Sequence, residues 1–123
     1  MRFLLIGLGG FLGANLRFLV QTWAAERFGS AFPYGTLVAN VTGSFILALF
    51  ITLITGRVLA SPNLRLFVAV GVLGGYTTFS SLTVETLNLV QDGRWLLGGV
   101  NLFGNVLLGL SAAFAGVVLA RAL

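Results

Sequence analysis

The chain has 123 residues, of which 58% are hydrophobic and only 8% are charged, and its mean hydropathy is +1.04. A soluble domain carries about a quarter charged residues, so this composition excludes a water-facing surface and predicts one domain, residues 1–123, dissolved in lipid. Histidine, lysine and cysteine are absent, and the three acidic residues are too separated in sequence to form a catalytic pair, so an enzyme is not expected.

Four apolar segments of roughly 20 residues, enough to cross the ~30 Å hydrocarbon core of a bilayer, follow one another along the chain. They cover residues 3–25, 34–55, 66–90 and 95–119. A charge and a turn residue lie in each intervening segment, and Asn63 is expected to cap the third helix. Aromatic rings that favour the membrane interface fall at segment ends, at Trp23, Tyr34 and Trp95. The sequence predicts an all-α, multi-pass protein of the cell inner (plasma) membrane with four transmembrane helices.

The first segment repeats Gly9, Gly13 and Arg17 at intervals of four residues, which places them on one helical face. The two glycines, like Gly109 and Gly116 in the fourth segment, are expected to let neighbouring helices approach closely. Arg17 lies about two turns from the end of its segment, where it either snorkels to the interface or faces a water-filled vestibule.

The second segment has a polar face that contains Thr36, Asn40 and Ser44. An amide without a partner in hydrocarbon costs several kcal/mol, so Asn40 needs a hydrogen-bonding partner. Two interpretations stay open: Asn40 lines a polar pathway, or it simply bonds to a neighbouring helix.

The third segment contains GGYTTFSS, residues 74–81, near its midpoint. Paired glycines weaken a helix, and the hydroxyl side chains after them can bond to the local backbone. We therefore expect a break at 74–78, although a kinked but continuous helix is the alternative. A break in the bilayer commonly presents free carbonyls to a cation. If two chains packed antiparallel, two carbonyls from each would form a four-oxygen site for an ion such as Na⁺.

Polar side chains continue beyond the break and along the fourth segment. One face of the third segment carries Thr77, Ser81 and Glu85, and the fourth segment carries Asn101 and Asn105 on a stripe of small residues. Phe79 either fills ordinary packing or presents its electropositive ring edge to an anion. Together with Asn40 and Arg17, this inventory of hydrogen-bond donors suits a small, strongly hydrated anion.

The arginines are spread over both chain ends and every loop, so the pI near 11.3 indicates interfacial anchoring, and no nucleic-acid partner is expected. With four spans, both termini and the second loop share one side. That side holds Arg2, Arg57, Arg65 and Arg121, against Arg27 and Arg94 on the other, with Arg17 inside the first span. So weak a bias permits insertion in both orientations, and hence an antiparallel homodimer, but is also found in proteins of fixed topology.

Three stretches, GGFLGANLR at 9–17, TLVANVTGSF at 36–45 and GGYTTFSS at 74–81, resemble the Fluc (CrcB) fluoride channels, and the resemblance extends over all four spans. It implies a dual-topology antiparallel homodimer that passively exports fluoride through two pores and holds a central, structural Na⁺. The backbone carbonyls of Gly74 and Thr77 would bind the Na⁺.

The same resemblance assigns the pathway residues. Asn40 and Phe79 would line the fluoride pathway, with Ser81 nearby, and Arg17 matches an arginine near the aqueous vestibule. The roles of Thr36 and Glu85 stay open.

Two departures from the family pattern stand out. The family typically has a second phenylalanine where this chain has Leu82, and its fourth span typically carries Tyr and then Ser, where we place Asn101 and Asn105. The two asparagines can donate from their amides and either substitute for the missing ring or alter conduction. We expect fluoride efflux to survive and Asn101 to matter unusually.

Two other classes of protein remain possible on the sequence alone. A dual-topology small multidrug exporter also has four short spans, but it would be expected to carry a carboxylate deep in its first span, where this chain has none. A structural membrane subunit would use the same polar faces only to bind other helices.

Overall fold

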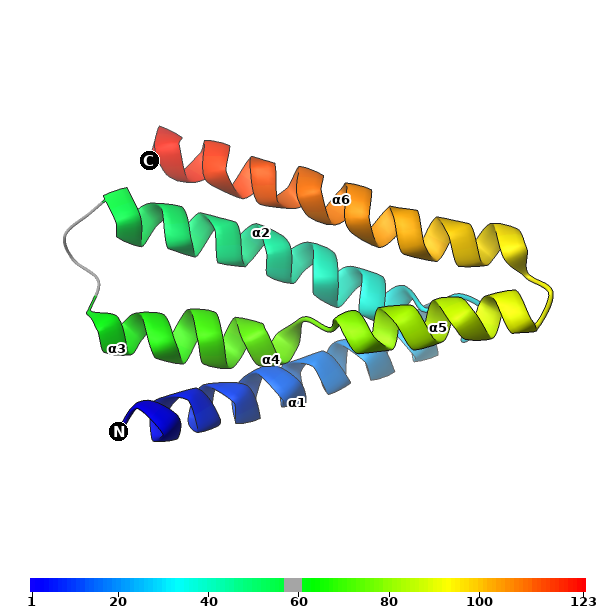
Figure 1. Cartoon of the computed structure of the whole chain (residues 1–123), viewed down its shortest axis with the longest axis horizontal. Helices are drawn as coiled ribbons and strands as arrows, with labels where there is room; N and C mark the ends of the chain where they lie inside the picture. The colour runs from blue at the N-terminus through cyan, green and yellow to red at the C-terminus, as the bar shows by residue number, and fades with distance from the viewer. Residues whose placement is uncertain (57–60) are drawn as a thin grey trace.

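The computed structural model describes residues 1–56 and 61–123, so Arg57 lies outside the described residues. Figure 1 shows an elongated bundle of helices that run side by side. The helices are α1 (Arg2–Phe28), α2 (Tyr34–Gly56), α3 (Pro62–Arg65), the π-helix η1 (Leu66–Leu73), α4 (Gly74–Tyr76), α5 (Phe79–Gln91) and α6 (Trp95–Ala122). In the described part of the chain, four helical segments are long and apolar enough to cross a membrane, the third being Pro62–Gln91.

The two chain termini lie at the same end of the bundle, as four spans require (Figure 1). The α1–α2 and α5–α6 connections lie at the opposite end (Figure 1). Both of these connections contain a glycine with positive φ, Gly29 at 84° and Gly93 at 80°, a conformation that other residues rarely adopt. Arg2, Arg65 and Arg121 therefore belong to one end of the molecule and Arg27 and Arg94 to the other.

The third membrane segment begins differently from our prediction. Ser61, not Asn63, caps α3: its backbone is extended and its hydroxyl accepts a hydrogen bond from the Leu64 N–H at 3.1 Å. Pro62 occupies the first helical turn, where its missing N–H is not needed. Asn63 is already inside the helix and cannot serve as its cap.

Close contact between α1 and the first half of the third segment depends on glycine. A Cβ added at Gly9 would lie 2.8 Å from the Cα of Gly71, and one added at Gly13 would overlap the Val72 carbonyl. A Cβ at Gly116 would likewise overlap the Phe45 carbonyl of α2. The prediction of close packing is confirmed at these three positions. It is wrong at Gly109, where the nearest atom, Ser44 Oγ, would be 3.6 Å away and a methyl group would fit.

The predicted break in the third segment is confirmed, but it is narrower than residues 74–78. Gly74 keeps helical angles, with φ −63° and ψ −37°, and α4 continues to Tyr76. Only Thr77 (φ −82°, ψ 157°) and Thr78 (φ −151°, ψ 117°) are extended. Gly75 stays in the helix and lies close to α1, since an added Cβ would be 3.0 Å from the Gly10 carbonyl oxygen. Gly75 therefore serves the helix contact, and the two threonines form the break.

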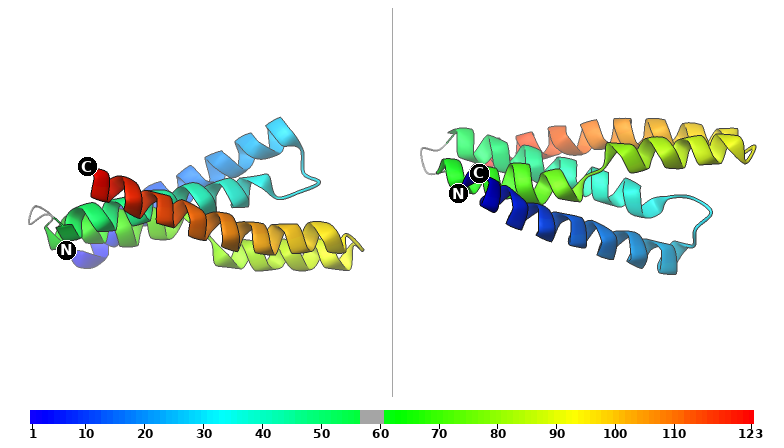
Figure 2. Two further views of the ribbon diagram at one scale, coloured as in Figure 1. Left: turned by 90° about the horizontal axis from the view of Figure 1, so that it is seen from above. Right: turned by 60° about the horizontal axis from the view of Figure 1, so that its bottom comes forward.

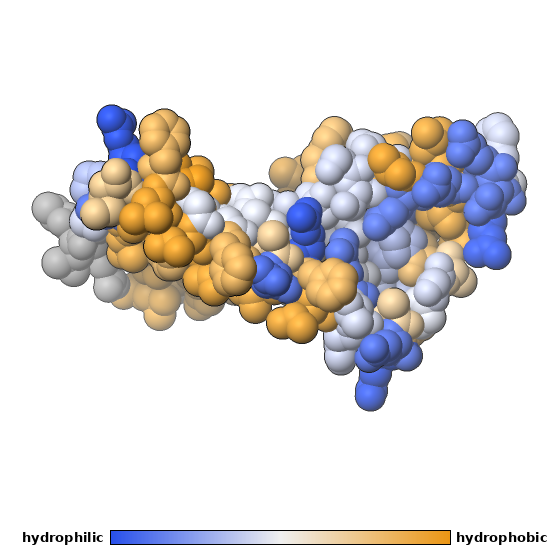
Figure 3. Space-filling model, turned by 90° about the horizontal axis from the view of Figure 1, so that it is seen from below, coloured by the Kyte–Doolittle hydropathy of each residue, from blue (hydrophilic) through white to orange (hydrophobic). Residues whose placement is uncertain are grey.

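The bundle opens at the end opposite the termini, where α1 diverges from α5 and α6 (Figure 2). Viewed from below, hydrophobic side chains cover most of the half that holds the termini, whereas hydrophilic ones gather toward the open end (Figure 3). The break therefore lies where an apolar half of the bundle meets a more polar one.

Candidate functional site

Asn40 of α2 holds the break by two hydrogen bonds to one residue. Its Oδ1 accepts the Thr78 N–H at 2.8 Å, and its Nδ2 donates to the Thr78 carbonyl at 3.0 Å. An extended residue in a membrane helix would otherwise leave both backbone groups unsatisfied, which is tolerated only where protein or a cavity supplies partners. The Asn40 side chain supplies both partners.

The carbonyls of Gly74 and Thr77, which the family resemblance assigns to a cation, lose their usual helical donors. In a continuous helix the Thr78 N–H would bond to the Gly74 carbonyl, but here it donates to Asn40. The Ser81 N–H would bond to the Thr77 carbonyl, but it donates to the Thr78 hydroxyl at 3.1 Å. Two backbone oxygens are thereby available at the break, and oxygen is the ligand that hard cations prefer. The donor set fits a sodium ion.

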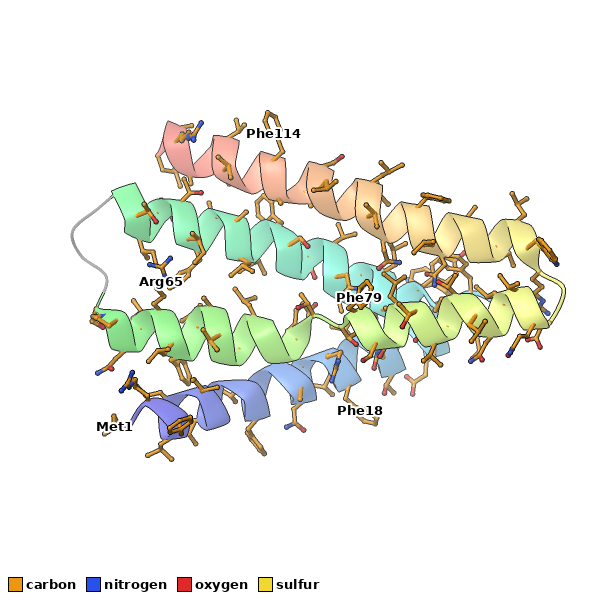
Figure 4. All side chains as sticks on the ribbon, viewed as in Figure 1. Met1, Phe18, Arg65, Phe79 and Phe114 are labelled. Carbon is orange, nitrogen blue, oxygen red and sulfur yellow. The ribbon has the colours of Figure 1, made fainter. Side chains whose placement is uncertain are left out.

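A cavity of about 290 Å³ lies beside the break. Its lining includes Asn40, Phe79, Leu82 and Asn105, so it gathers residues from α2, α5 and α6. The Phe79 ring is 75% exposed at the start of α5 (Figure 4), whereas Leu82 is buried in the wall. The structure thus brings Asn40, Asn105 and Phe79 to one cavity. Leu82, which replaces a second ring, lines the same cavity.

A ladder of amide side chains connects α6 to the break. Asn105 Oδ1 accepts from Asn40 Nδ2 at 2.9 Å, and Asn105 Nδ2 donates to the carbonyl and Oδ1 of Asn101 at 2.7 and 3.1 Å. Asn101 Nδ2 in turn donates to the Thr86 hydroxyl of α5 at 3.0 Å. Asn101 is completely buried and Asn105 is nearly so. We call this set of side chains, Thr86, Asn101, Asn105 and Asn40, the amide ladder.

A second cavity, of about 470 Å³, lies toward the open end of the bundle, and Thr36, Ser81 and Glu85 are among its lining residues. The Thr36 hydroxyl donates to Glu85 Oε1 at 2.9 Å and accepts from Gln21 Nε2 at 3.2 Å. Glu85 Oε2 is a buried oxygen with no hydrogen-bond partner in the described part of the chain. Ser81 lies between Phe79 and Leu82 in the sequence of α5. Those two residues line the first cavity, whereas Ser81 lines the second.

Arg17 is the predicted site residue that the structure does not bring to the others. Its side chain is half-buried on α1, lines neither cavity and makes no hydrogen bond or ion pair with any described residue. It lies four residues from Gly13, which contacts the third segment, and four from Gln21, which lines the second cavity.

Some residues that build the site were missed from the sequence. Thr78 caps α5 through its hydroxyl, a role that threonine before a new helix could have indicated. Gln21 lies one turn beyond Arg17 on the same helical face, which could have marked it as a neighbour. Thr42 and Tyr76, whose hydroxyl oxygens lie 2.9 Å apart, attach α2 to the last residue of α4, and no sequence pattern signals that pair.

Comparison with known proteins gives a consistent result. A family model described as "CrcB-like protein, Camphor Resistance (CrcB)" matches residues 4–117. A protein of Roseiflexus sp. (strain RS-1) named "Fluoride-specific ion channel FluC" is 44% identical over 123 residues, covering 100% of this chain and 99% of the relative. Proteins of the same name from Sulfurihydrogenibium sp. (strain YO3AOP1) and Rhizobium meliloti (strain 1021) are 48% and 45% identical, over 99% and 98% of this chain and 98% and 96% of the relatives.

Proposed function

The chain belongs to the CrcB family, and from this membership we propose that it is a passive, fluoride-selective ion channel rather than an enzyme. Relatives named fluoride-specific ion channels match it over essentially its whole length, and this observation carries the proposal. The four membrane-spanning helices make it a multi-pass membrane protein, as a channel requires.

The two cavities on either side of the first turns of α5 support a pathway for the anion. Phe79 and Asn105 line one of them, and Ser81 lines the other. The Ser81 hydroxyl oxygen accepts a bond from the Thr78 hydroxyl at 3.0 Å, so its own hydrogen is free to donate. Fluoride holds its water tightly, so it needs donors that replace that water without binding too strongly for release.

Asn101 belongs to the same proposal, although it reaches the pathway through Asn105. It has one amide hydrogen beyond the one it donates to Thr86, and it fixes the orientation of the Asn105 side chain. Arg17 is proposed to attract anions from the aqueous side, with the role of a vestibule residue. Its charge lacks an acidic partner among the described residues, which leaves it available for this role.

An antiparallel homodimer with a central sodium ion completes the proposal. Gly74 and Thr77 would hold the ion with their carbonyls, which have lost their helical donors, and Gly74 is exposed on this chain. The break lies near the middle of its membrane segment, so the breaks of two oppositely inserted chains can meet at the bilayer midplane. A bound sodium ion supplies fixed positive charge at this contact.

A passive pore is enough to remove fluoride from a cell. Uncharged HF crosses bilayers and ionises in a near-neutral cytoplasm, which traps the anion inside. A membrane potential drives a negative charge outward with ~2.3 kcal/mol per 100 mV. No carboxylate needs to carry protons for this function, in contrast to a proton-coupled exporter.

Fluoride efflux from liposomes tests the proposal. Purified protein should release fluoride but retain chloride when only an electrical driving force is applied and no proton gradient is present. Phe79→Ile should lower the efflux by at least about fivefold, because loss of the ring edge removes a contact of roughly 1 kcal/mol or more from each ion. Phe114→Ile is the matched control, since Phe114 is 72% exposed and points away from the bundle (Figure 4).

Three results would contradict the proposal. Chloride efflux at the rate of fluoride would remove the selectivity. Efflux that required a proton gradient would favour an exporter, and a purified protein that carried no ion at all would favour a structural subunit.

A further inference from the structure

We propose that Asn40 is a positioning residue for the metal site rather than a donor to fluoride, and that α6 adjusts this site through the amide ladder. The inference rests on the proposed function, because it concerns the sodium ion and the fluoride pathway of the same channel. It assigns to Asn40 the task of keeping the Gly74 and Thr77 carbonyls free of helical hydrogen bonds.

The hydrogen bonds of Asn40 leave it no donor for an ion. A side-chain amide has two N–H donors and one carbonyl oxygen. The donors reach the Thr78 carbonyl and Asn105 Oδ1, at 3.0 and 2.9 Å, and the oxygen accepts the Thr78 N–H at 2.8 Å. To donate to a passing fluoride, Asn40 would have to release either the break or the ladder.

The chemistry of Thr78 requires an amide at position 40. Its extended backbone presents one donor and one acceptor side by side, so the partner must accept and donate at the same time. A carboxylate accepts but does not donate, and a hydroxyl is too short to span both groups. Asparagine meets both demands in a single orientation, which fixes the assignment of its oxygen and nitrogen atoms.

Asn40 also prevents the helix from closing over the Gly74 carbonyl. If it released Thr78, the Thr78 N–H could return to the Gly74 carbonyl and close another helical turn. The Gly74 oxygen would then point along the helix to a backbone donor and be lost to a cation. The side chain of Asn40 and a sodium ion thus favour the same backbone conformation, which makes their effects cooperative.

The amide ladder carries this coupling to α6. Asn105 is also fully committed, because its Nδ2 bonds to both oxygens of Asn101 and its Oδ1 accepts from Asn40. A change at Asn105 therefore acts on the metal site through Asn40, although Asn105 lines the anion cavity. Linkage makes such an effect reciprocal, so sodium binding should also steady the amide ladder beside the cavity that Asn105 lines.

Sodium-dependent thermal unfolding tests the inference separately from ion flux. Purified protein in detergent is titrated with Na⁺ against a large organic cation, and the apparent Na⁺ affinity is read from the rise in unfolding temperature. We expect Asn40→Ala to weaken this affinity by ~10-fold, within the usual range of coupling between sites. Asn105→Ala removes one of the three Asn40 bonds and should weaken it by a smaller factor. Asn15→Ala is the matched control, because Asn15 is exposed and its side chain bonds, among the described residues, to the Phe11 carbonyl of its own helix alone.

The outcomes separate this inference from the proposed function. Suppose that the parent protein releases fluoride. If both variants then bind Na⁺ as tightly as the parent does, the inference is wrong and the channel function stands. The same holds if Na⁺ does not stabilise the parent at all. If Asn40→Ala does not fold, Asn105→Ala decides alone, since it keeps both bonds to Thr78. If the parent releases no fluoride, the proposed function fails, whatever its response to Na⁺.

Discussion

Asn101 is the most deeply buried of the large polar side chains, with no exposed surface. It receives two hydrogen bonds from Asn105 and donates one to Thr86 of α5. An amide buried among membrane helices is stable only while such partners persist. Asn101 therefore connects α5 to α6 and fixes the Asn105 side chain, which lines the cavity beside the break.

We expect Asn101→Ala to reduce fluoride efflux from liposomes by about tenfold or more. The substitution removes the side-chain acceptor of Asn105 and the bond from α6 to the Thr86 hydroxyl, which keeps only its bond to the Leu82 carbonyl, and a buried donor left unsatisfied costs about 1–3 kcal/mol. Asn15→Ala, which removes an exposed amide, should leave efflux unchanged. Equal efflux from the parent and Asn101→Ala would show that the asparagines of α6 do not take part in conduction.

Leu82 takes the place of a second aromatic ring in the cavity beside the break. It is 4% exposed and lines the same cavity as Asn105 and Phe79. An aliphatic side chain offers an anion no positive edge, so among the described lining residues Phe79 alone brings a ring to this cavity. The Asn105 amide stands on the α6 side of this cavity, and its N–H groups are held by Asn101.

At the scale of helices, the contact between α1 and the third segment is a backbone-to-backbone contact. Gly9 and Gly13 face the stretch from Phe67 to Tyr76, and no space for a side chain remains between the helices. Such close approach is a main source of helix association in lipid, where apolar surface gains nothing by burial. This contact also fixes the position of α4, and with it one edge of the break.

Gly13→Ala should therefore destabilise the protein. We expect the free energy of unfolding to fall by about 1–3 kcal/mol, because the added methyl group overlaps the Val72 carbonyl and forces the helices apart. Thermal unfolding in detergent measures the change. Gly7→Ala, on the same helix with no atom near the added methyl group, should be neutral or slightly stabilising. Similar unfolding temperatures for the two variants would refute the role given to Gly13.

At the scale of the whole molecule, each end of the bundle carries positive charge. Arg2, Arg65 and Arg121 belong to the end with the termini, and Arg27 and Arg94 to the other. Orientation in the membrane follows the difference in arginine and lysine between the two sides. Because the numbers of described arginines at the two ends are nearly equal, both orientations are expected.

Single cysteines can measure orientation cleanly, because the chain has no cysteine of its own. Ser30→Cys and Asn63→Cys place an exposed thiol at opposite ends of the bundle. In intact cells, an impermeant thiol reagent should label about half of the copies of each variant, as a nearly balanced charge distribution predicts. After permeabilisation both variants should label fully. Labelling of one variant only would mean a single orientation and would exclude the antiparallel homodimer.

Residue composition and segment length were enough to predict the membrane environment and the four helices, and GGYTTFSS favoured a break over a kinked but continuous helix. These follow from composition, segment length and local backbone chemistry, which neighbouring residues in the chain decide together. The sequence also pointed to Gly74, Thr77, Asn40, Phe79 and Asn105, four of which the structure places together at the break or its cavity, while Gly74 begins the helical turn before it.

Which hydrogen bonds and contacts these residues make between helices could be learned only from the tertiary structure. Helix faces predict which side chains point the same way, but not their partners on other helices, which depend on how far each helix is rotated and shifted. The two bonds from Asn40 to Thr78, the ladder from Asn40 to Thr86 and the Gly13 contact are all of this kind. For the same reason the break is confined to Thr77 and Thr78: Gly75 is held in the helix against α1, and the Asn40 amide of α2 bonds to Thr78.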